Sequence, residues 1–190
     1  MPKRPHRLMF VCTANICRSP MAAGLARAEA DRRGMPVEIR SGGVLDMIGR
    51  PAAPNAVRAC AEVDSDITHH RSAGVTADDA SWADAMLVME MRHQQELHMR
   101  HPELDGRVVL LGTFGGRPEI DDPVGGWMWR FRRTRKLLQR SIERFLDLLD
   151  PTGVDIAPTV VASDLTEGDS GPTGVASDFT GVGDDSMHWP

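Results

Sequence analysis

The segment that most constrains this chain is an apolar run that passes through a short loop into a helical pattern. Residues 8–11 read Leu-Met-Phe-Val, the loop runs from Cys12 to Ser19, and the helical pattern begins at Pro20. A buried strand joined tightly to a helix is half of a strand–helix–strand unit, which favours a parallel sheet. We expect Ser19 to cap the helix and Pro20 to occupy its first turn.

The same alternation continues to residue 149. Strand-like runs lie at 7–11, 37–41, 85–89 and 107–111, and helix-like patterns at 20–33, 53–63, 91–99 and 127–149. This order predicts an α/β domain whose helices cover both faces of a parallel sheet. Sites in such sheets lie beyond the carboxyl ends of the strands, which is where Cys12 falls.

Charge divides the chain at residue 150. All 22 Lys and Arg lie in residues 1–150, whereas the last forty residues hold seven acidic groups and no Lys or Arg. The net charge of −5 therefore splits into +2 for residues 1–150 and −7 for residues 151–190. We predict one folded domain over 1–150. The acidic, Gly- and Ser-rich tail over 151–190 is expected to be disordered, because it has too little apolar surface to offset its ordering entropy.

Composition also bounds location and partners. Three cysteines, two of them in one loop, are not a disulfide framework, and this favours the reducing cytoplasm. The apolar run at 8–12 is too short for a signal peptide or a membrane span, so no membrane insertion is expected. The basic cluster at 130–136 is interpreted as a solvated helix face rather than a nucleic-acid surface. A second interpretation is that it attracts the acidic tail or acidic substrates.

The loop residues indicate nucleophilic chemistry on a phosphate. Backbone N–H groups of a curled loop and a helix N-terminus converge on one point and favour an anion there. The same field and Arg18 favour the thiolate of Cys12, and Ser19 can donate a hydrogen bond to it. Arg18 can hold two phosphoryl oxygens at once. No metal or other cofactor is needed, and His93, His98 and His101 lack metal-ligand spacing, so we interpret them as a solvated helix face.

These residues carry a resemblance to a known family. The run from Cys12 to Pro20 resembles the Cys-x-x-Asn-x-Cys-Arg-Ser-Pro signature of the low-molecular-weight protein tyrosine phosphatases. Further similar segments are Ser41-Gly42-Gly43, His69-His70-Arg71-Ser72, residues 83–90 and Asp122-Pro123. The resemblance spans about residues 6 to 150. It implies a four-stranded parallel sheet in the order 2-1-3-4 and a phosphorylated protein as the substrate.

The resemblance also implies roles for individual residues. Cys12 would form a phosphocysteine intermediate, Arg18 would bind the phosphoryl group, and Asp122 would be the general acid. The phosphate would lie among Thr13, Ala14, Asn15, Ile16, Cys17, Arg18 and Ser19. Ser41 and His70 would fix the loop through Asn15. Cys17 would form a protective disulfide with an oxidised Cys12.

Departures from the family pattern fall at the expected entrance of the cleft. Val124 stands where an aromatic residue usually follows Asp-Pro, Met47 replaces another frequent aromatic, and Trp127 follows shortly after. We expect Met47, Val124 and Trp127 to wall the cleft. Ile16 is typical of tyrosine-directed members, whereas members that act on phosphoarginine tend to have Thr there.

We therefore predict a metal-independent phosphatase for phosphotyrosine-type monoesters. A phosphoarginine phosphatase and an arsenate reductase that uses an external thiol are the alternatives. The chain has no cysteine between residues 61 and 190, which argues against an arsenate relay through two further cysteines. Nothing in the sequence indicates an oligomeric state.

Overall fold

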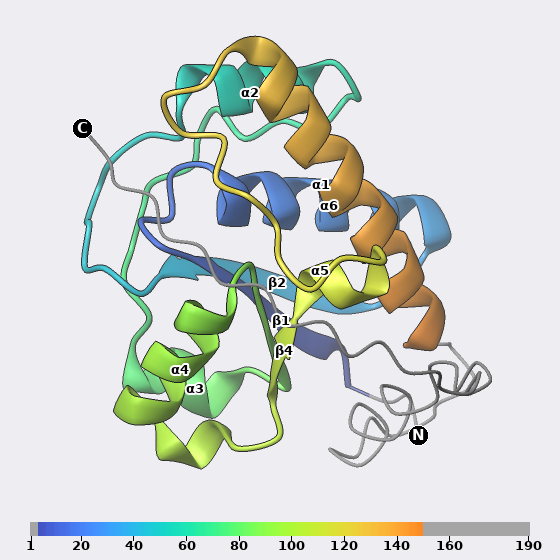
Figure 1. The fold of residues 1–190 in the computed structure, drawn as a ribbon. Coiled ribbons are helices and arrows are strands. Elements are labelled where there is room, and N and C mark those ends of the chain that lie inside the picture. The colour runs from blue at the N-terminus through green and yellow to red at the C-terminus, as the bar shows by residue number, and fades with distance from the viewer. Residues whose placement is uncertain (1–3, 150–190) are drawn as a thin grey trace, which may run out of the picture.

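The four apolar runs form one parallel sheet in a computed structural model, which describes residues 4–149 (Figure 1). The strands are β1 (His6–Cys12), β2 (Val37–Gly43), β3 (Ala85–Val88) and β4 (Val108–Leu110). They pair in parallel in the order β2-β1-β3-β4, so the predicted class and strand order are confirmed. The predicted tail, residues 151–190, lies outside the described residues.

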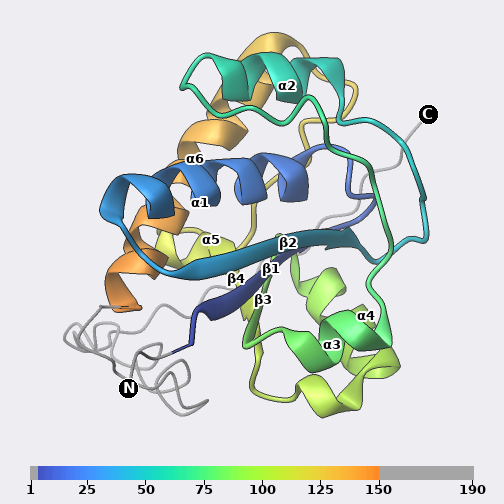
Figure 2. The same cartoon turned by 180° about the vertical axis from the view of Figure 1, so that it is seen from behind.

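Helices lie on both sides of the sheet, with α1, α2, α5 and α6 on one side and α3 and α4 on the other (Figures 1 and 2). On the first side α2 lies beyond α1 and packs on α1 and α6. They are α1 (Arg18–Arg33), α2 (Pro54–Ala61), α3 (Ala77–Trp82), α4 (Met91–Arg100), α5 (Leu111–Phe114) and α6 (Met128–Leu148), with the 3-10 turn η1 (Pro102–Leu104). Leu8 and Phe10 of β1 pack in the core on the α1 side, whereas Met9 and Val11 pack in the core on the α3 side. Burial on both faces explains why this strand is continuously apolar.

The predicted elements are confirmed to within a few residues at their ends, but three short elements are not predicted. These are α3 with six residues, η1 with three and α5 with four. A segment this short shows too little of a 3.6-residue period to stand out in the sequence. The helix α3 depends instead on a capping box between Thr76 and Asp79.

The predicted cap of α1 is wrong. The helix begins at Arg18, one residue before Ser19, and no side chain caps it at Cys17. The Ser19 hydroxyl lies instead 3.0 Å from the Cys12 thiol. Pro20 falls in the first turn, as expected.

The long helix α6 packs its apolar face on α1, α2 and α5 and turns its charged face outward. Its buried side chains include Phe131, Leu138, Ile142 and Phe145, which recur at helical spacing. In the part of the chain from residue 4 to residue 149, no helix has both the length and the apolar character needed to cross a membrane.

Candidate active site

The catalytic loop predicted from the sequence connects the end of β1 to the start of α1, at the carboxyl edge of the sheet. It passes very close to the end of β2. A Cβ on Gly43 would lie 2.9 Å from the carbonyl oxygen of Thr13 and 3.1 Å from the backbone nitrogen of Asn15. Only glycine leaves room for this approach, so Gly43 lets the loop curl over the strand end.

Backbone carbonyl and N–H groups of the loop have different partners. The carbonyl oxygens of Cys12, Thr13 and Ile16 each accept a hydrogen bond of 2.8–2.9 Å from a backbone N–H in the segment 44–53. Within residues 4–149, the backbone N–H groups of residues 13–18 donate to no protein acceptor. Six free amide donors at the start of a 16-residue helix are suited to bind a phosphate dianion.

Asn15 fixes the shape of the loop from its centre. It is fully buried and adopts a left-handed backbone conformation with φ of 54°. Its side-chain amide donates to Ser41 (3.0 Å) and Ser19 (2.8 Å), and its carbonyl Oδ1 accepts from the N–H of Ala73 (3.0 Å). Its backbone oxygen lies 2.7 Å from Nε2 of His70, whose pKa is lowered mainly by burial. The structure therefore brings together the three residues of the network implied by the resemblance.

The thiol of Cys12 lies on the floor of the loop. Cys12 is 3% exposed, and its sulfur is 3.0 Å from the Ser19 hydroxyl. That hydroxyl donates to the carbonyl oxygen of Gly42 at 3.2 Å and accepts from Asn15. Its single proton can rotate from the Gly42 carbonyl to a thiolate at Cys12 while the Ser19 oxygen stays in place.

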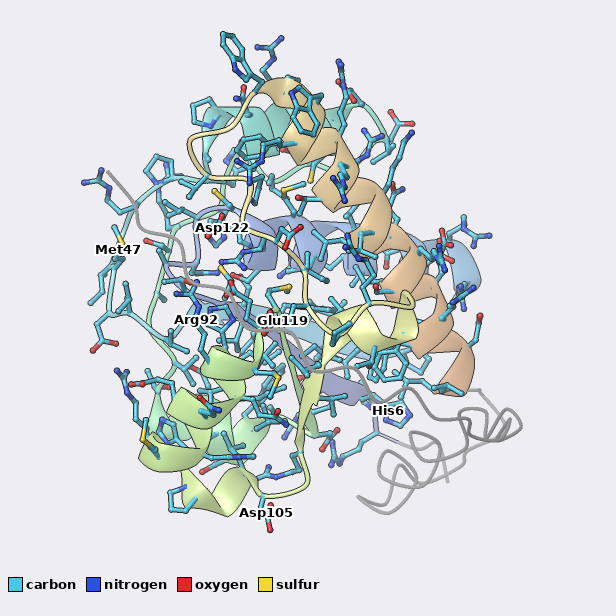
Figure 3. The ribbon with its side chains drawn as sticks, in the orientation of Figure 1. His6, Met47, Arg92, Asp105, Glu119 and Asp122 are labelled. Carbon is cyan, nitrogen blue, oxygen red and sulfur yellow. The ribbon has the colours of Figure 1, made fainter. Side chains whose placement is uncertain are left out.

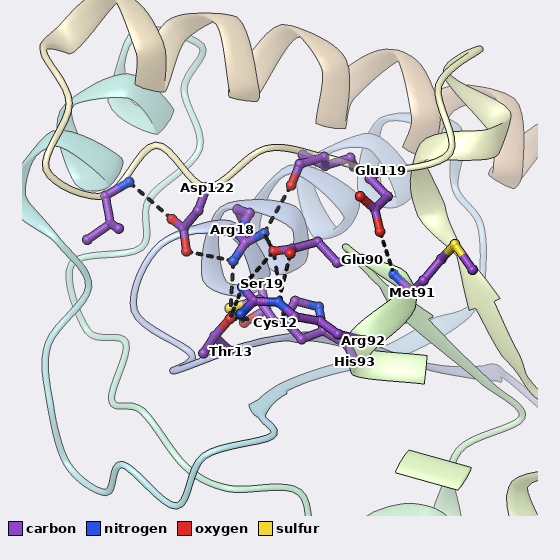
Figure 4. Close-up of polar contacts among 12 residues, drawn as sticks. Cys12, Thr13, Arg18, Ser19, Glu90, Met91, Arg92, His93, Glu119 and Asp122 are labelled. Atoms are coloured by element: carbon purple, nitrogen blue, oxygen red, sulfur yellow. Dashed lines mark hydrogen bonds and ion pairs between the residues drawn. The ribbon is translucent and has the colours of Figure 1, made fainter. Parts of the chain in front are cut away.

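Arg18 is fully buried and is held by two carboxylates (Figure 4). Its Nη1 donates to Glu90 and to the carbonyl oxygen of Ile120 at 3.0 Å, and its Nη2 donates to Asp122 at 2.6 Å. Its Nε is buried and has no hydrogen-bond partner within the described residues. The Nε–Nη2 edge is thus the edge that a phosphoryl group can bind in place of Asp122.

Sequence reasoning missed the residues that hold Arg18 and the loop from the β3 side. Burial opposes ionisation of Glu90, but hydrogen bonds from Arg92 and Arg18 outweigh it and lower the pKa of Glu90 to about 2. Its carboxylate therefore stays charged at neutral pH. Glu90 comes almost directly after β3, and β3 lies next to β1 in the sheet. An acidic residue at the carboxyl end of a neighbouring strand can be expected near the loop that follows β1, so this position could have identified Glu90 from the sequence.

The prediction that His93 lies on a solvated face is wrong. His93 is 1% exposed, and its Nε2 lies 2.9 Å from the Thr13 hydroxyl oxygen. Burial and the charge of Arg18 lower the pKa of His93 to about 4, so the ring is neutral at pH 7. The side chain packs inward because its position on α4 faces the sheet with Leu97.

Asp122 reaches the site on the long loop between α5 and α6. Three hydrogen bonds, two to the backbone of Ile120 and one to the side chain of Glu119, hold this loop in place. The N–H of Ile120 donates to the Met89 carbonyl (2.9 Å), and the Ile120 carbonyl accepts from Arg18. The Glu119 carboxylate accepts from the N–H of Met91 (2.8 Å).

The two adjacent acids of this loop differ in their surroundings. Besides its pairing with Arg18, Asp122 accepts from the N–H of Val124 at 3.0 Å. The neighbouring Asp121 is exposed.

The three predicted cleft-wall residues lie on two loops. Figure 3 places Met47 at the outer edge of the molecule, on the segment that follows β2. Val124 and Trp127 follow Asp122 on the loop between α5 and α6, and their exposed fractions are 57% and 81%. The exposed Leu45 on the Met47 segment adds to the apolar surface there. Lining of the cleft by these side chains stays a prediction.

Comparison with known proteins matches this arrangement to a family. The family model described as low molecular weight phosphotyrosine protein phosphatase matches residues 7–154. The chain belongs to this family. The resemblance noted in the sequence is confirmed, and membership makes the protein a cysteine-based phosphatase.

Named members of the family are similar over nearly their whole length. A probable low molecular weight protein-tyrosine-phosphatase, EpsP, of Ralstonia nicotianae is 34% identical over 147 residues, which is 77% of this chain and 97% of the relative. A protein-arginine-phosphatase of Geobacillus stearothermophilus is 34% identical over 148 residues, which is 76% of this chain and 97% of the relative. The crystal structure of a low molecular weight protein tyrosine phosphatase from T. tengcongensis has a TM-score of 0.72 and 32% identity, over 76% of this chain and 99% of that one.

Cysteine pairing offers a first test of the loop. Mild peroxide should oxidise Cys12 to a sulfenic acid, and the Cys17 thiol should then displace water to form a disulfide. Burial and the nearby charges of Asp122 and Cys12 raise the pKa of Cys17 to about 12, so this second step should be slower than with an ordinary thiol. We expect reversible inactivation, with the Cys12 and Cys17 peptides found linked by mass spectrometry.

Two controls sharpen this redox experiment. Cys17→Ser should make inactivation harder to reverse with a thiol reductant. Cys60 is buried in α2, and burial raises its pKa to about 12 as well, so Cys60→Ala should behave like the wild type. A Cys12–Cys60 disulfide would contradict the expected pairing.

Proposed function

We propose that the protein hydrolyses phosphotyrosyl groups on proteins through a phosphocysteine intermediate. The thiolate of Cys12 attacks phosphorus, so that an S–P bond forms and the P–O bond to the leaving group breaks. Asp122 gives its proton to the departing phenolic oxygen. Water then attacks phosphorus with Asp122 accepting its proton, the S–P bond breaks, and inorganic phosphate and the thiolate are released.

The observation that carries this proposal is the convergence of donors around one sulfur. The free N–H groups of residues 13–18 and the unpaired Nε of Arg18 stabilise the equatorial oxygens of a transferring phosphoryl group. Ser19 stabilises the thiolate as it leaves in the second step. These groups are fixed before substrate binds, because Asn15 and Glu90 hold the loop and the arginine.

In this mechanism the phosphoryl group displaces Asp122 from Arg18. The arginine pairs with the Asp122 carboxylate at 2.6 Å in the structure. A bound phosphoryl dianion takes over the Nη2 donor. The freed Asp122 carboxylate then takes up a proton from solvent and turns to the leaving-group oxygen as the acid. Binding of the dianion and positioning of the acid are thus one event.

Ile16 favours tyrosine over arginine as the phosphorylated residue. Isoleucine is typical of the tyrosine-directed members of the family at this position, whereas members that act on phosphoarginine tend to have threonine there. In the structure Ile16 is partly buried and packs against the main core. The related arginine phosphatase makes phosphoarginine the competing substrate. Arsenate with an external thiol is the other competing reaction.

A panel of substrates tests the assignment. We expect the highest kcat/KM on a phosphotyrosine peptide, with phosphoarginine and phosphoserine versions of the same peptide at least about tenfold slower, and no thiol-dependent turnover of arsenate. The variant Ile16→Thr should shift the ratio toward phosphoarginine, since threonine is typical of the family members that act on phosphoarginine. Faster turnover of phosphoarginine by the wild type would reject the proposed substrate class.

We further propose that the enzyme works in the cytoplasm without a metal. All three cysteines are free thiols in the structure, which suits a reducing compartment. Within residues 4–149 there is no group of three His, Cys, Asp or Glu side chains that could hold a metal ion. Activity should persist after dialysis against a chelator, because the loop N–H groups and Arg18 are expected to neutralise the phosphoryl charge.

A further inference from the structure

The outward face of α6 carries a row of positive charge. Arg133, Lys136, Arg140 and Arg144 follow one another at intervals of three and four residues, which places them on one side of the helix. All four are exposed. With a rise of 1.5 Å per residue, the row is about 16 Å long. We call these four side chains the basic stripe.

The basic stripe is uncompensated within the described residues. None of its four members forms an ion pair with an acidic side chain there, whereas Arg132 and Arg135 of the same helix both pair with Glu62. The nearby acid Asp147 is already paired with Arg33, and Glu143 is the other acidic group on that side of the helix. The helix therefore carries two arginines that pair with an acid and a row of cations that have no acidic partner within residues 4–149, of which Arg144 donates to the carbonyl oxygen of Phe114 at 3.1 Å.

The charge is also placed against the helix dipole. The first turns of α6 contain no acidic residue but carry Arg130, Arg132 and Arg133, at the end of the helix where the dipole is positive. Cations at this end are unfavourable, and an anionic partner would relieve them. Arg133, which has no acidic partner within the described residues, therefore lies where a positive charge lowers the stability of the helix.

The stripe leads to the active site. At its upstream end is a hollow of about 340 Å³, which Arg117, Arg130 and Arg133 line together with Trp129 and Asp122. Arg130 donates to the Asp122 carbonyl oxygen at 3.0 Å. An anionic segment on the stripe would therefore end beside the general acid.

We propose that the acidic tail, residues 151–190, docks on the basic stripe of its own chain. The tail begins directly after α6, carries seven acidic groups and has no Lys or Arg. Forty residues are long enough to cover the stripe, since even a random coil of that length has a span of roughly 35 Å. Because the tail is tethered to the same chain, its local concentration at the stripe is in about the millimolar range. An acidic segment of another protein that is present below this concentration would therefore compete poorly for the stripe.

Docking makes the tail a competitor of acidic substrates. It covers the hollow beside Asp122, so a phosphoprotein with acidic flanks must displace it, whereas a small neutral substrate need not. This consequence rests on the proposed phosphatase function, but the docking itself does not. The two can therefore be tested separately.

The chain contains a built-in reporter for docking. Lys3 and Lys136 are its only lysines, and Lys136 lies in the stripe. In the full-length protein at low micromolar concentration, a carbodiimide activates a carboxyl group, the Lys136 amine attacks it, and an amide forms as the reagent leaves as a urea. We expect mass mapping to find Lys136 joined to tail carboxylates in low salt. The yield should fall at least threefold in 1 M NaCl, because salt screens exposed charges.

Two matched variants test whether the stripe is the partner. Arg133→Glu/Arg140→Glu should reduce the cross-link at least threefold. The control Arg50→Glu/Arg71→Glu makes the same change in net charge on exposed residues of other loops and should leave the yield unchanged. A full chain with its seven tail acids changed to amides should give no Lys136–tail link and leaves the described part of the chain untouched.

Three results would overturn the docking. In the first, Lys136 remains unlinked, and in the second it links only to carboxylates within residues 4–149. In the third, a mixture of isotopically labelled and unlabelled protein gives links only between different copies, which would mean that the contact is between chains. For the competition, the amide variant should raise kcat/KM at least threefold on an acidic phosphopeptide and leave it unchanged on a neutral one. An unchanged ratio together with the cross-link would reject the competition and retain the docking.

Discussion

Replacement of Cys12 by serine should abolish turnover while the protein still binds phosphate. The free N–H groups of residues 13–18 and Arg18 remain in place in Cys12→Ser, so the anion site persists. The serine hydroxyl is a far weaker nucleophile than a thiolate. We expect kcat to fall by at least about 10⁴-fold, the scale on which removal of a covalent nucleophile acts in other enzymes. Stopped assays give kcat, and calorimetry with inorganic phosphate gives binding.

The matched control for this experiment is Cys60→Ala. Cys60 is as buried as Cys12 but lies in α2, away from the loop, so loss of its thiol should leave kcat close to that of the wild type. Thermal unfolding of both variants reports on folding. A Cys12→Ser protein that keeps a tenth of the wild-type activity would contradict the covalent mechanism.

Replacement of Asp122 by alanine should slow substrates according to their leaving group. A poor leaving group such as an alkylphenol needs a proton, and loss of a general acid costs about 10²–10⁴-fold in rate. A good leaving group such as a nitrophenol departs as the anion and should be affected much less. A plot of log kcat/KM against leaving-group pKa should therefore be steeper for Asp122→Ala than for the wild type.

Asp121→Ala is the internal control for the acid. Asp121 is adjacent in sequence but exposed, whereas Asp122 pairs with Arg18. Its removal changes the net charge of the loop equally, so a general electrostatic effect would be seen in both variants. If Asp121→Ala steepened the plot and Asp122→Ala did not, the assignment of the acid would be wrong.

The sequence predicts best what local pattern determines. The apolar run at 8–11 and the helical period at 127–149 identify β1 and α6 because burial imposes a strong periodicity on long elements. The strand order followed from the family resemblance. The loop from Cys12 to Arg18 was found because all its parts are contiguous.

The sequence predicts poorly what distant segments bring together. Glu90 pairs with Arg18, which is 72 residues away in the sequence. The residues around Glu90 do not distinguish it from any other acidic residue that precedes a helix. His93 is read as a solvated residue because its helix is short and polar, yet burial against the sheet makes it a neutral contact of Thr13. The hydroxyl of Ser19 is predicted to cap a helix, but the thiol beside it is the partner that the fold supplies.

The bracing of the loop from both sides has a consequence for refolding. Asn15 depends on Ala73, 58 residues away, and Arg18 depends on Asp122, 104 residues away. Contacts of such separation form late, because long loops must close first. A partly refolded chain with only β1, α1 and β2 in place would hold the thiol without its arginine clamp. Recovery of catalysis should therefore lag behind recovery of helical signal, and peroxide added during that lag should damage a larger fraction of molecules than peroxide added afterwards.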